Sequence, residues 1–211
     1  MGLYICIEGM DFCGKSTLAK YISNVYKARM IGEPFAETPE GKAFKDKLVS
    51  NQLTLDQEIQ GFATARVEAF TKVIQPTLEA DGNIVSDRNF FSSMVYQSDE
   101  VIGMEEVFEV NRKLLETYNF NIIPDVVFFI DINHEEFMRR LNKVKDDGRE
   151  INAKDLMFTD KEKFDLYRER YIQAFDYITK RYGTPVYRLT PDMNFSRNIA
   201  KILRWHKEQK K

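Results

Sequence analysis

Short apolar runs alternate along the chain with longer segments in which apolar residues recur every three or four positions. The short runs are rich in Val, Ile, Phe and Tyr and predict five strands, at residues 3–7, 28–31, 83–86, 126–130 and 186–189. Residues 3–7 and 126–130 are apolar throughout instead of alternating. That pattern is typical of strands in a parallel sheet that is covered on both faces.

Two long segments have the periodicity of amphipathic helices, residues 55–78 and residues 160–182. We expect the second to bury one side in the core, with the stripe Phe164, Tyr167, Tyr171, Ala174, Phe175 and Ile178. The first has one charged member, Arg66, in a stripe that otherwise consists of Leu55, Ile59, Phe62, Phe70, Val73 and Leu78.

Strands and helices that alternate from end to end predict an α/β fold, in which a doubly wound parallel sheet of five strands forms three layers with helices on both faces. The 211 residues suit a single domain over residues 1–211. Residues 143–155 hold many charges and little that could be buried, so we interpret them as a mobile loop and short lid. Ligands of such a sheet gather at the carboxyl ends of its strands.

Composition narrows the possible partners. Lys and Arg number 31 against 33 Asp and Glu, and this balance gives no reason to expect a nucleic-acid polymer or an anionic membrane as partner. The chain begins with a strand-like run and has no apolar stretch of the roughly 18 residues that a membrane span needs, so we expect a soluble, unprocessed protein. Cys6 and Cys13 suit neither a disulfide framework nor a zinc site, which favours the cytoplasm.

The sequence GMDFCGKST at residues 9–17 fits the phosphate-loop pattern G-x-x-x-x-G-K-[ST], between an apolar strand and the start of a helix. Its glycines let backbone N–H groups turn toward phosphate at a helix N-terminus. We expect Lys15 to neutralise the β and γ phosphates of ATP and Ser16 to bind Mg²⁺. The fold is therefore predicted to be that of a P-loop NTPase, with the ATP-binding residues Gly9, Met10, Asp11, Phe12, Cys13, Gly14, Lys15, Ser16 and Thr17.

Two other predicted strands end in charged residues, Glu33-Pro34 and Asp87-Arg88. Both ends should face the phosphate loop, because carboxyl ends of parallel strands meet at one edge of the sheet. An arginine fork suits a phosphate, and a carboxylate can hold Mg²⁺ through water. We therefore expect Arg88 to bind phosphate and Asp87 to join Ser16 at the metal.

Five stretches occur in a characteristic order: residues 7–17, Glu33-Pro34, Phe62-x-x-x-Arg66, Asp87-Arg88 with Ser92, Ser93, Tyr96 and Gln97, and Pro124-Asp125. In these stretches the chain resembles the thymidylate kinase family, part of the nucleoside monophosphate kinase group of P-loop kinases. The resemblance implies ATP-dependent phosphorylation of dTMP to dTDP by direct in-line transfer, with Mg²⁺, nucleotides as the partners, and a homodimer. It also implies that Asp11 contacts the acceptor sugar.

The expected acceptor-binding residues are Glu33, Pro34, Phe62, Arg66, Arg88, Ser93, Tyr96 and Gln97. Phe62 and Arg66 are four apart and point the same way from one helix. Arg66 would donate to thymine O4, where cytosine carries an amino donor, while Phe62 would stack on the base. Core packing for Phe62, a snorkelling Arg66 and an exposed helical Gln97 are the alternatives.

The chain departs from the family at two positions that concern phosphate. Gly32 stands where an arginine is usual, which leaves the acceptor phosphate to Arg88, with Arg29 or Lys42 as helpers. Phe12 stands where some members place an arginine, so a cation from residues 143–149 would have to reach the transferred group. The predicted catalytic residues are Lys15, Arg88, Asp11 and Arg149.

Two other functions compete with this interpretation. In a deoxynucleoside kinase, the glutamate of Glu33-Pro34 would act as base on a 5′-hydroxyl, but Asp87 stands where those enzymes tend to have glutamate. A nucleotide switch would need an Asn-Lys-x-Asp guanine reader, and Lys145 occupies the aspartate position of the nearest candidate.

Overall fold

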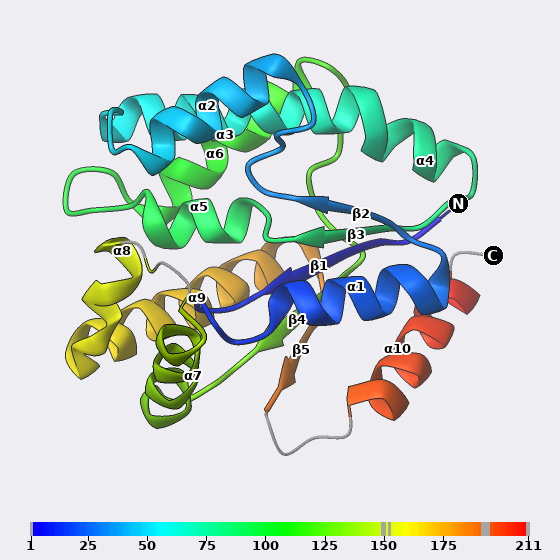
Figure 1. Cartoon of the computed structure of the whole chain (residues 1–211). Helices are drawn as coiled ribbons and strands as arrows, with labels where there is room; N and C mark the ends of the chain where they lie inside the picture. Colours follow the sequence, from blue (N-terminus) through cyan, green and yellow to red (C-terminus); the bar gives the residue numbers. More distant parts are fainter. Residues whose placement is uncertain (1, 149–150, 152, 191–194, 210–211) are drawn as a thin grey trace.

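The computed structural model describes residues 2–148, 151, 153–190 and 195–209. Its centre is one sheet of five parallel strands in the order β2-β3-β1-β4-β5 (Figure 1). The strands are β1 (Tyr4–Glu8), β2 (Arg29–Gly32), β3 (Ile84–Asp87), β4 (Val126–Ile130) and β5 (Val186–Leu189). The five predicted strands and their parallel arrangement are confirmed.

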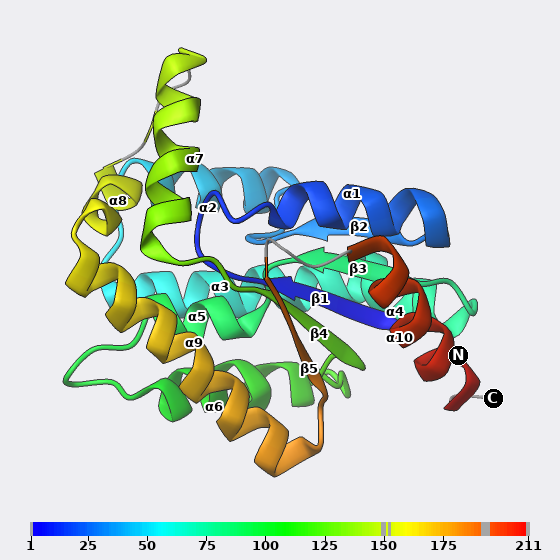
Figure 2. The same cartoon turned by 90° about the horizontal axis from the view of Figure 1, so that it is seen from below.

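Helices cover the sheet on both sides, as predicted. Figure 2 shows α1 on one side of the strands and α6 and α9 on the other. The helical elements are α1 (Lys15–Tyr26), α2 (Pro39–Val49), α3 (Leu55–Ala69), the π-helical η1 (Phe70–Ile74), α4 (Gln75–Glu79), α5 (Phe90–Tyr96), α6 (Met104–Glu116), α7 (His134–Asp146), α8 (Ala153–Leu156), the 3₁₀ turn η2 (Met157–Thr159), α9 (Lys161–Tyr182) and α10 (Phe195–Gln209).

The two strands predicted to be covered on both faces are fully buried. Every residue of β1 and of β4 is buried, and Ile5 pairs with Val85 on one side and with Val126 on the other. The α9 stripe packs against this core through Phe164, Tyr171, Ala174, Phe175 and Ile178, and Tyr167 is only partly buried. None of the helices that the structure describes is long and apolar enough to cross a membrane.

The order of the strands positions the site. β1 lies between β3 and β4, so the loop that leaves its carboxyl end opens into the crevice where the chain turns to opposite sides of the sheet. Asp87 ends β3 and Gly32 ends β2, and Gly32 is in register with Asp87. The phosphate loop, Glu33 and Arg88 therefore emerge along one edge.

The helix predicted over residues 55–78 is interrupted. It begins where Thr54 and Gln57 form a capping box, but a π-helical segment separates α3 from α4. Pro76 lies in the first turn of α4, has no N–H to donate and would place its ring against the carbonyl group of Lys72. The wider π-helical turn before it accommodates this local mismatch.

The prediction of a loop over residues 143–155 is wrong at both ends of this segment. Residues 143–146 form the last turn of α7, and residues 153–155 lie in α8. The scarcity of apolar residues indicated exposure, which a solvated helix shares with a loop. Lys143 and Lys145 lie at the C-terminus of α7, where positive charge interacts favourably with the helix dipole. Gly148 follows the helix with φ 71°. Arg149, the predicted lid cation, lies outside the described residues.

Candidate active site

The phosphate loop joins β1 to α1, and two of its glycines adopt conformations that side chains disfavour. Gly9 has φ 147°, and a Cβ there would lie 2.6 Å from the carbonyl oxygen of Ile130. Gly14, the N-cap of α1, has φ 103°. These conformations turn the loop around the N-terminus of α1, where free backbone N–H groups and the helix dipole favour an anion.

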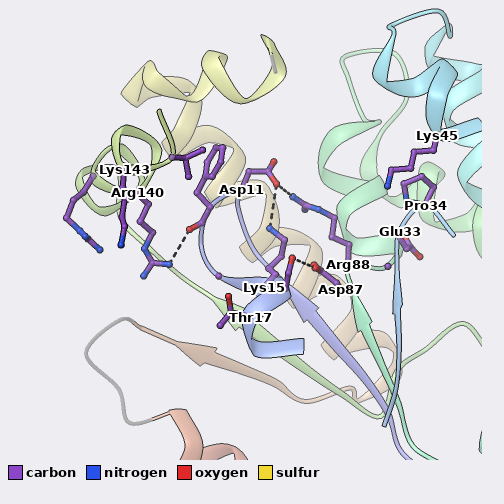
Figure 3. Close-up of a pocket in the computed structure, with 16 residues that line it drawn as sticks. Asp11, Lys15, Thr17, Glu33, Pro34, Lys45, Asp87, Arg88, Arg140 and Lys143 are labelled. Carbon is purple, nitrogen blue, oxygen red and sulfur yellow. Dashed lines mark hydrogen bonds and ion pairs between the residues drawn. The ribbon is translucent and has the colours of Figure 1, made fainter. Parts of the chain in front are cut away.

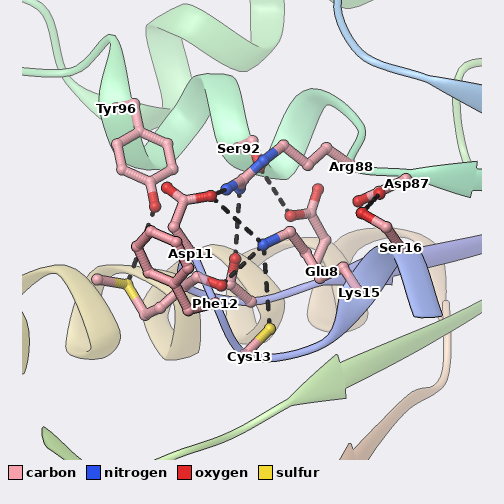
Figure 4. Close-up of polar contacts among 12 residues, drawn as sticks. Glu8, Asp11, Phe12, Cys13, Lys15, Ser16, Asp87, Arg88, Ser92 and Tyr96 are labelled. Atoms are coloured by element: carbon pink, nitrogen blue, oxygen red, sulfur yellow. Dashed lines mark hydrogen bonds and ion pairs between the residues drawn. The ribbon is translucent and has the colours of Figure 1, made fainter. Parts of the chain in front are cut away.

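Lys15 begins α1 and folds back over the loop. Its Nζ donates to the carbonyl oxygen of Met10 at 2.7 Å and lies 3.7 Å from Oδ1 of Asp11 and 3.9 Å from Sγ of Cys13 (Figure 4). Burial raises the pKa of the Cys13 thiol, which keeps it neutral beside the ammonium group. The lysine charge is thus held inside the loop.

The two residues predicted to bind the metal contact each other. Ser16 Oγ donates to Asp87 Oδ2 at 2.5 Å, joining the first turn of α1 to the end of β3. A hydroxyl and a carboxylate are hard oxygen ligands of the kind that Mg²⁺ prefers, and Mg²⁺ in nucleotide sites takes most other ligands from phosphates and water. The described residues contain no cluster of three or more His, Cys, Asp or Glu side chains that could enclose a metal by itself.

Arg88 lies at the centre of a buried polar network (Figure 4). Its Nη1 donates to Ser92 Oγ at 2.9 Å, Tyr171 Oη at 2.9 Å and the carbonyl oxygen of Gly9 at 3.3 Å, and its Nη2 forms an ion pair with Asp11. Burial would raise the pKa of Asp11, but the charges of Arg88 and Lys15 outweigh it and lower that pKa to about 2. The guanidinium is thereby fixed beside the phosphate loop.

Glu8, the last residue of β1, anchors this network and was not predicted as a site residue. Its Oε1 accepts from the backbone N–H of Asn89 at 2.7 Å and its Oε2 accepts from Ser92 Oγ at 2.8 Å. Burial raises the pKa of Glu8 to about 7 despite the nearby Arg88 charge. A carboxylate at the end of an otherwise apolar strand was the signal in the sequence.

On the acceptor side, Arg66 is buried and paired with Glu33, which precedes Pro34 in a cis peptide bond. Its Nε donates to Glu33 Oε1 at 2.6 Å, its Nη2 to Glu33 Oε2 and to Ser93 Oγ, and its Nη1 to Asn111 Oδ1. Arg66 is therefore no snorkelling residue, and in this structure Glu33 supplies two of the four acceptors that its buried guanidinium contacts.

Gln97 and Tyr96 lie at the end of α5, next to Ser93. The predicted alternative of an exposed Gln97 is wrong, because the residue is 5% exposed. Its Nε2 donates to Glu58 Oε2 at 3.4 Å, and its buried Oε1 has no hydrogen-bond partner among the described residues. Tyr96 places its ring 5.4 Å from the Arg88 guanidinium.

One large cleft, here called the phosphate cleft, brings the phosphate loop together with Glu33, Asp87 and Arg88 (Figure 3). It has a volume of about 780 Å³ and is lined by the phosphate loop, the ends of β2 and β3, α2 and α7. The predicted residues along it are Asp11, Phe12, Gly14, Lys15, Ser16, Thr17, Glu33, Pro34, Asp87 and Arg88. Its unpredicted cations are Lys45 of α2 and Arg139 and Arg140 of α7.

Phe62 and Arg66 do not line the phosphate cleft. They border a narrow cavity of about 10 Å³, which adjoins it because both are lined by Gly32, Glu33 and Pro34. The Phe62 ring packs edge-on against Phe44 with the centroids 5.3 Å apart.

The α7 side of the cleft is fixed to the phosphate loop. Arg140 Nη1 donates to the carbonyl oxygens of Cys13 at 2.5 Å and Phe12 at 3.2 Å, while its Nε donates to Glu136. Asp155 of α8 hydrogen-bonds with Asp11, and burial together with the Asp11 charge raises the pKa of Asp155 to about 6. The segment predicted as a lid thus reaches the loop.

Comparison with known proteins agrees with this arrangement. The family model for thymidylate kinase matches residues 7–184. The thymidylate kinase of Mycoplasma genitalium is 30% identical over 184 residues, which is 83% of either chain, and that of Thermoanaerobacter sp. is 31% identical over 192 residues, 86% of this chain and 87% of the relative. The crystal structure of thymidylate kinase from Ehrlichia chaffeensis shares the fold, with a TM-score of 0.64 and 22% identity over 96% of this chain and 98% of that one.

A phosphate loop on a doubly wound parallel sheet, facing a second polar wall across one cleft, defines a P-loop nucleotide kinase. The chain belongs to the thymidylate kinase family and is a nucleoside monophosphate kinase. The predicted family is confirmed.

Proposed function

We propose that this protein transfers the γ-phosphoryl group of ATP to the phosphate of dTMP, giving ADP and dTDP. The observation that carries the proposal is that the phosphate loop and the acceptor-side residues Glu33, Asp87 and Arg88 line the same cleft, in a chain of the thymidylate kinase family. Donor and acceptor phosphates can therefore meet without an enzyme-bound intermediate.

On the donor side, residues 9–17 cradle the phosphates of ATP, with Lys15 beside the transferred group. Ser16 and Asp87 would hold Mg²⁺, which would neutralise charge on the phosphates. A neighbouring pocket of about 380 Å³, lined by Leu18, Tyr21 and Arg140 among others, suits a flat base such as adenine. Because Phe12 offers no charge, Arg140 and Lys143 of α7, together with the predicted Arg149, supply cations for the transferred group.

On the acceptor side, we assign Phe62 to stack on thymine and Ser93, Tyr96 and Gln97 to enclose the base and sugar, which requires the cavity of about 10 Å³ beside Phe62 to widen when the substrate binds. A guanidinium has five N–H bonds and the described contacts of Arg66 use four of them, which leaves one on Nη1 for thymine O4. The unpartnered Oε1 of Gln97 suits the N3–H of thymine, where cytosine has only an acceptor. Both features favour thymine over cytosine.

The reaction needs positioning and charge more than proton transfer, because the attacking phosphate oxygen is already anionic. Arg88 binds the acceptor phosphate and Asp11 fixes Arg88 and contacts the sugar. Glu33 is held in a buried ion pair with Arg66, an arrangement that does not suit the base of a deoxynucleoside kinase.

We extend the proposal to the assembly and location of the protein. Family membership supports a homodimer, which sedimentation of the purified protein tests. The cysteines Cys6 and Cys13 are buried and free, which supports a reducing compartment such as the cytoplasm.

The proposal is tested by mixing the protein with ATP and Mg²⁺ and with dTMP, thymidine or no acceptor, and following ADP. In the presence of ATP and Mg²⁺, we expect ADP to form with dTMP but not with thymidine or without an acceptor. We expect this ADP formation to be lost when a chelator removes Mg²⁺. ADP formation with thymidine but not with dTMP would assign the protein to the deoxynucleoside kinases, and ADP formation without any acceptor would identify an ATPase.

A further inference from the structure

The acceptor half of the phosphate cleft has few charges that are free to bind a second phosphate. A nucleoside monophosphate carries close to two negative charges at neutral pH, because its second pKa is about 6. Arg88, the predicted ligand, already donates through Nη1 to Ser92, Tyr171 and the backbone of Gly9 and pairs through Nη2 with Asp11. Most of its donors are therefore engaged before the substrate binds.

Neither Gly32 nor the predicted helpers Arg29 and Lys42 supply a side chain to this half of the cleft. Gly32 lines it without a side chain. Arg29, which lies on the exposed edge strand β2, forms an ion pair with Glu37. Neither Arg29 nor Lys42 lines the cleft.

Lys45 of α2 lies where such a charge is needed. It lines the phosphate cleft together with Gly32, Glu33 and Pro34, and Figure 3 shows its side chain coming down from α2 beside Pro34, on the side of the cleft that holds Asp87 and Arg88. Among the residues that the structure describes, Lys45 forms no ion pair, so its ammonium group is free to bind an anion.

The helix that carries Lys45 is well fixed at its start. Thr38 caps α2 by accepting from the N–H of Gly41 at 3.0 Å, and its hydroxyl donates to Glu68 of α3 at 2.7 Å. A Cβ at Gly41 would lie 2.2 Å from the carbonyl oxygen of Phe35, so α2 packs closely on the segment that follows Pro34. The backbone position of Lys45 relative to the Glu33-Pro34 turn is thereby set by packing.

We propose that Lys45 binds the phosphate of the acceptor nucleotide, opposite Arg88, and so makes the protein select a nucleoside monophosphate over the nucleoside. The inference rests on the proposed function, because it assigns a ligand to the acceptor side of the same cleft. Lysine acts as a flexible point charge, which suits a phosphate that must be released as part of a diphosphate after transfer.

The test compares the full chain with its Lys45→Met, Lys45→Arg and Lys47→Met variants. Lys47 is the matched control, since it lies on the same helix but does not line the cleft. For Lys45→Met we expect dTMP to bind about 10- to 100-fold more weakly in calorimetry and its KM to rise likewise, as for loss of a charge-assisted hydrogen bond. The KM of ATP and the affinity for thymidine should stay within twofold, and Lys45→Arg should retain most of the affinity for dTMP.

The inference is overturned if Lys45→Met binds dTMP as well as the wild type does, or if it weakens thymidine or ATP as much as dTMP. A Lys45→Arg variant as weak as Lys45→Met would also overturn it, because the charge would then not be what matters. Wild-type protein that binds dTMP but forms no dTDP would contradict the proposed function, while the calorimetric comparison would still decide the role of Lys45.

Discussion

Glu8 shows how a single buried carboxylate can organise a site that it does not line. It receives hydrogen bonds from the Asn89 backbone and from Ser92, and Ser92 in turn receives one from Arg88. Arg88 has φ 74°, a conformation that non-glycine residues adopt rarely and that surrounding contacts must stabilise. We infer that Glu8 positions Arg88 for phosphate binding.

Replacing Glu8 by Gln should change how stability depends on pH. The pKa of Glu8 is raised from an ordinary value near 4.5 to about 7, so between these values the folded protein binds more protons than the unfolded chain. The stabilisation from this shift is complete below about pH 4.5 and is lost as pH rises through 7, by about 3 kcal/mol. Urea unfolding at pH 4.5 and pH 8 should show Glu8→Gln gaining stability relative to the wild type at the higher pH. A difference between the two proteins that does not vary with pH would contradict the raised pKa.

Removing Arg66 should affect stability and acceptor binding separately. Arg66→Ala leaves the buried Glu33 carboxylate without its partner, and we expect the free energy of unfolding to fall by about 3 kcal/mol. The KM of dTMP should rise at least tenfold and that of ATP much less.

The matched control is the double variant Arg66→Ala with Glu33→Gln. It should recover much of the stability in urea unfolding, because the unpaired charge is gone, but not the affinity for dTMP. An equal rise in the KM of both substrates would refute the acceptor role of Arg66.

At this scale, the residues that a local motif predicts have their neighbours close in the chain. Lys15 and Ser16 are fixed by a local motif. The ion pair between Glu33 and Arg66 joins residues 33 positions apart, and the contact from Glu8 to Ser92 spans 84. Lys45 was missed for the same reason, since only the packing of α2 beside Pro34 brings it to the cleft.

At the scale of elements, the phosphate loop depends on glycine at position 9. Gly9 has φ 147°, and Gly9→Ala would place a methyl group 2.6 Å from the carbonyl oxygen of Ile130, so the loop must shift. We expect a loss of about 1–3 kcal/mol in unfolding free energy and a fall of at least 100-fold in kcat/KM for ATP.

The control for this change is Gly103→Ala. A Cβ at Gly103 would meet nothing within 4 Å, and its φ is −73°. It should unfold within about 1 kcal/mol of the wild type and keep full activity. If Gly9→Ala behaves like Gly103→Ala in thermal unfolding and steady-state kinetics, the close approach to Ile130 is not a constraint on the loop.

Elements were predicted best where one physical cause dominates. The buried strands β1 and β4 follow from continuous apolar sequence. The boundary between α3 and α4 depends on how the chain accommodates Pro76, and periodicity does not report it. The last turn of α7 shows the converse, since charged residues without an apolar stripe still form a helix.

At the scale of the whole molecule, the sheet order explains why a phosphate loop becomes a kinase site. β1 carries the loop, and β3 and β2 lie on one side of it. β3 ends in Asp87, and β2 ends at Gly32, directly before Glu33. The three ends share one edge, so donor and acceptor walls face each other across the phosphate cleft (Figure 3). The parallel fold and its ligand edge could be predicted from the alternation of elements, whereas the wall contributed by α2 and α7 depends on tertiary packing.

We propose that the residues of the phosphate cleft catalyse the phosphorylation of a thymine monophosphate. The most direct measurement is the rate at which ATP and Mg²⁺ convert dTMP, dCMP, dGMP and AMP to their diphosphates, with products separated by chromatography. We expect dTDP and ADP in equal amounts, and dCMP at least tenfold slower because it lacks the O4 acceptor and the N3–H donor. Conversion of dCMP or a purine monophosphate as fast as dTMP, or no dTDP at all, would contradict the account.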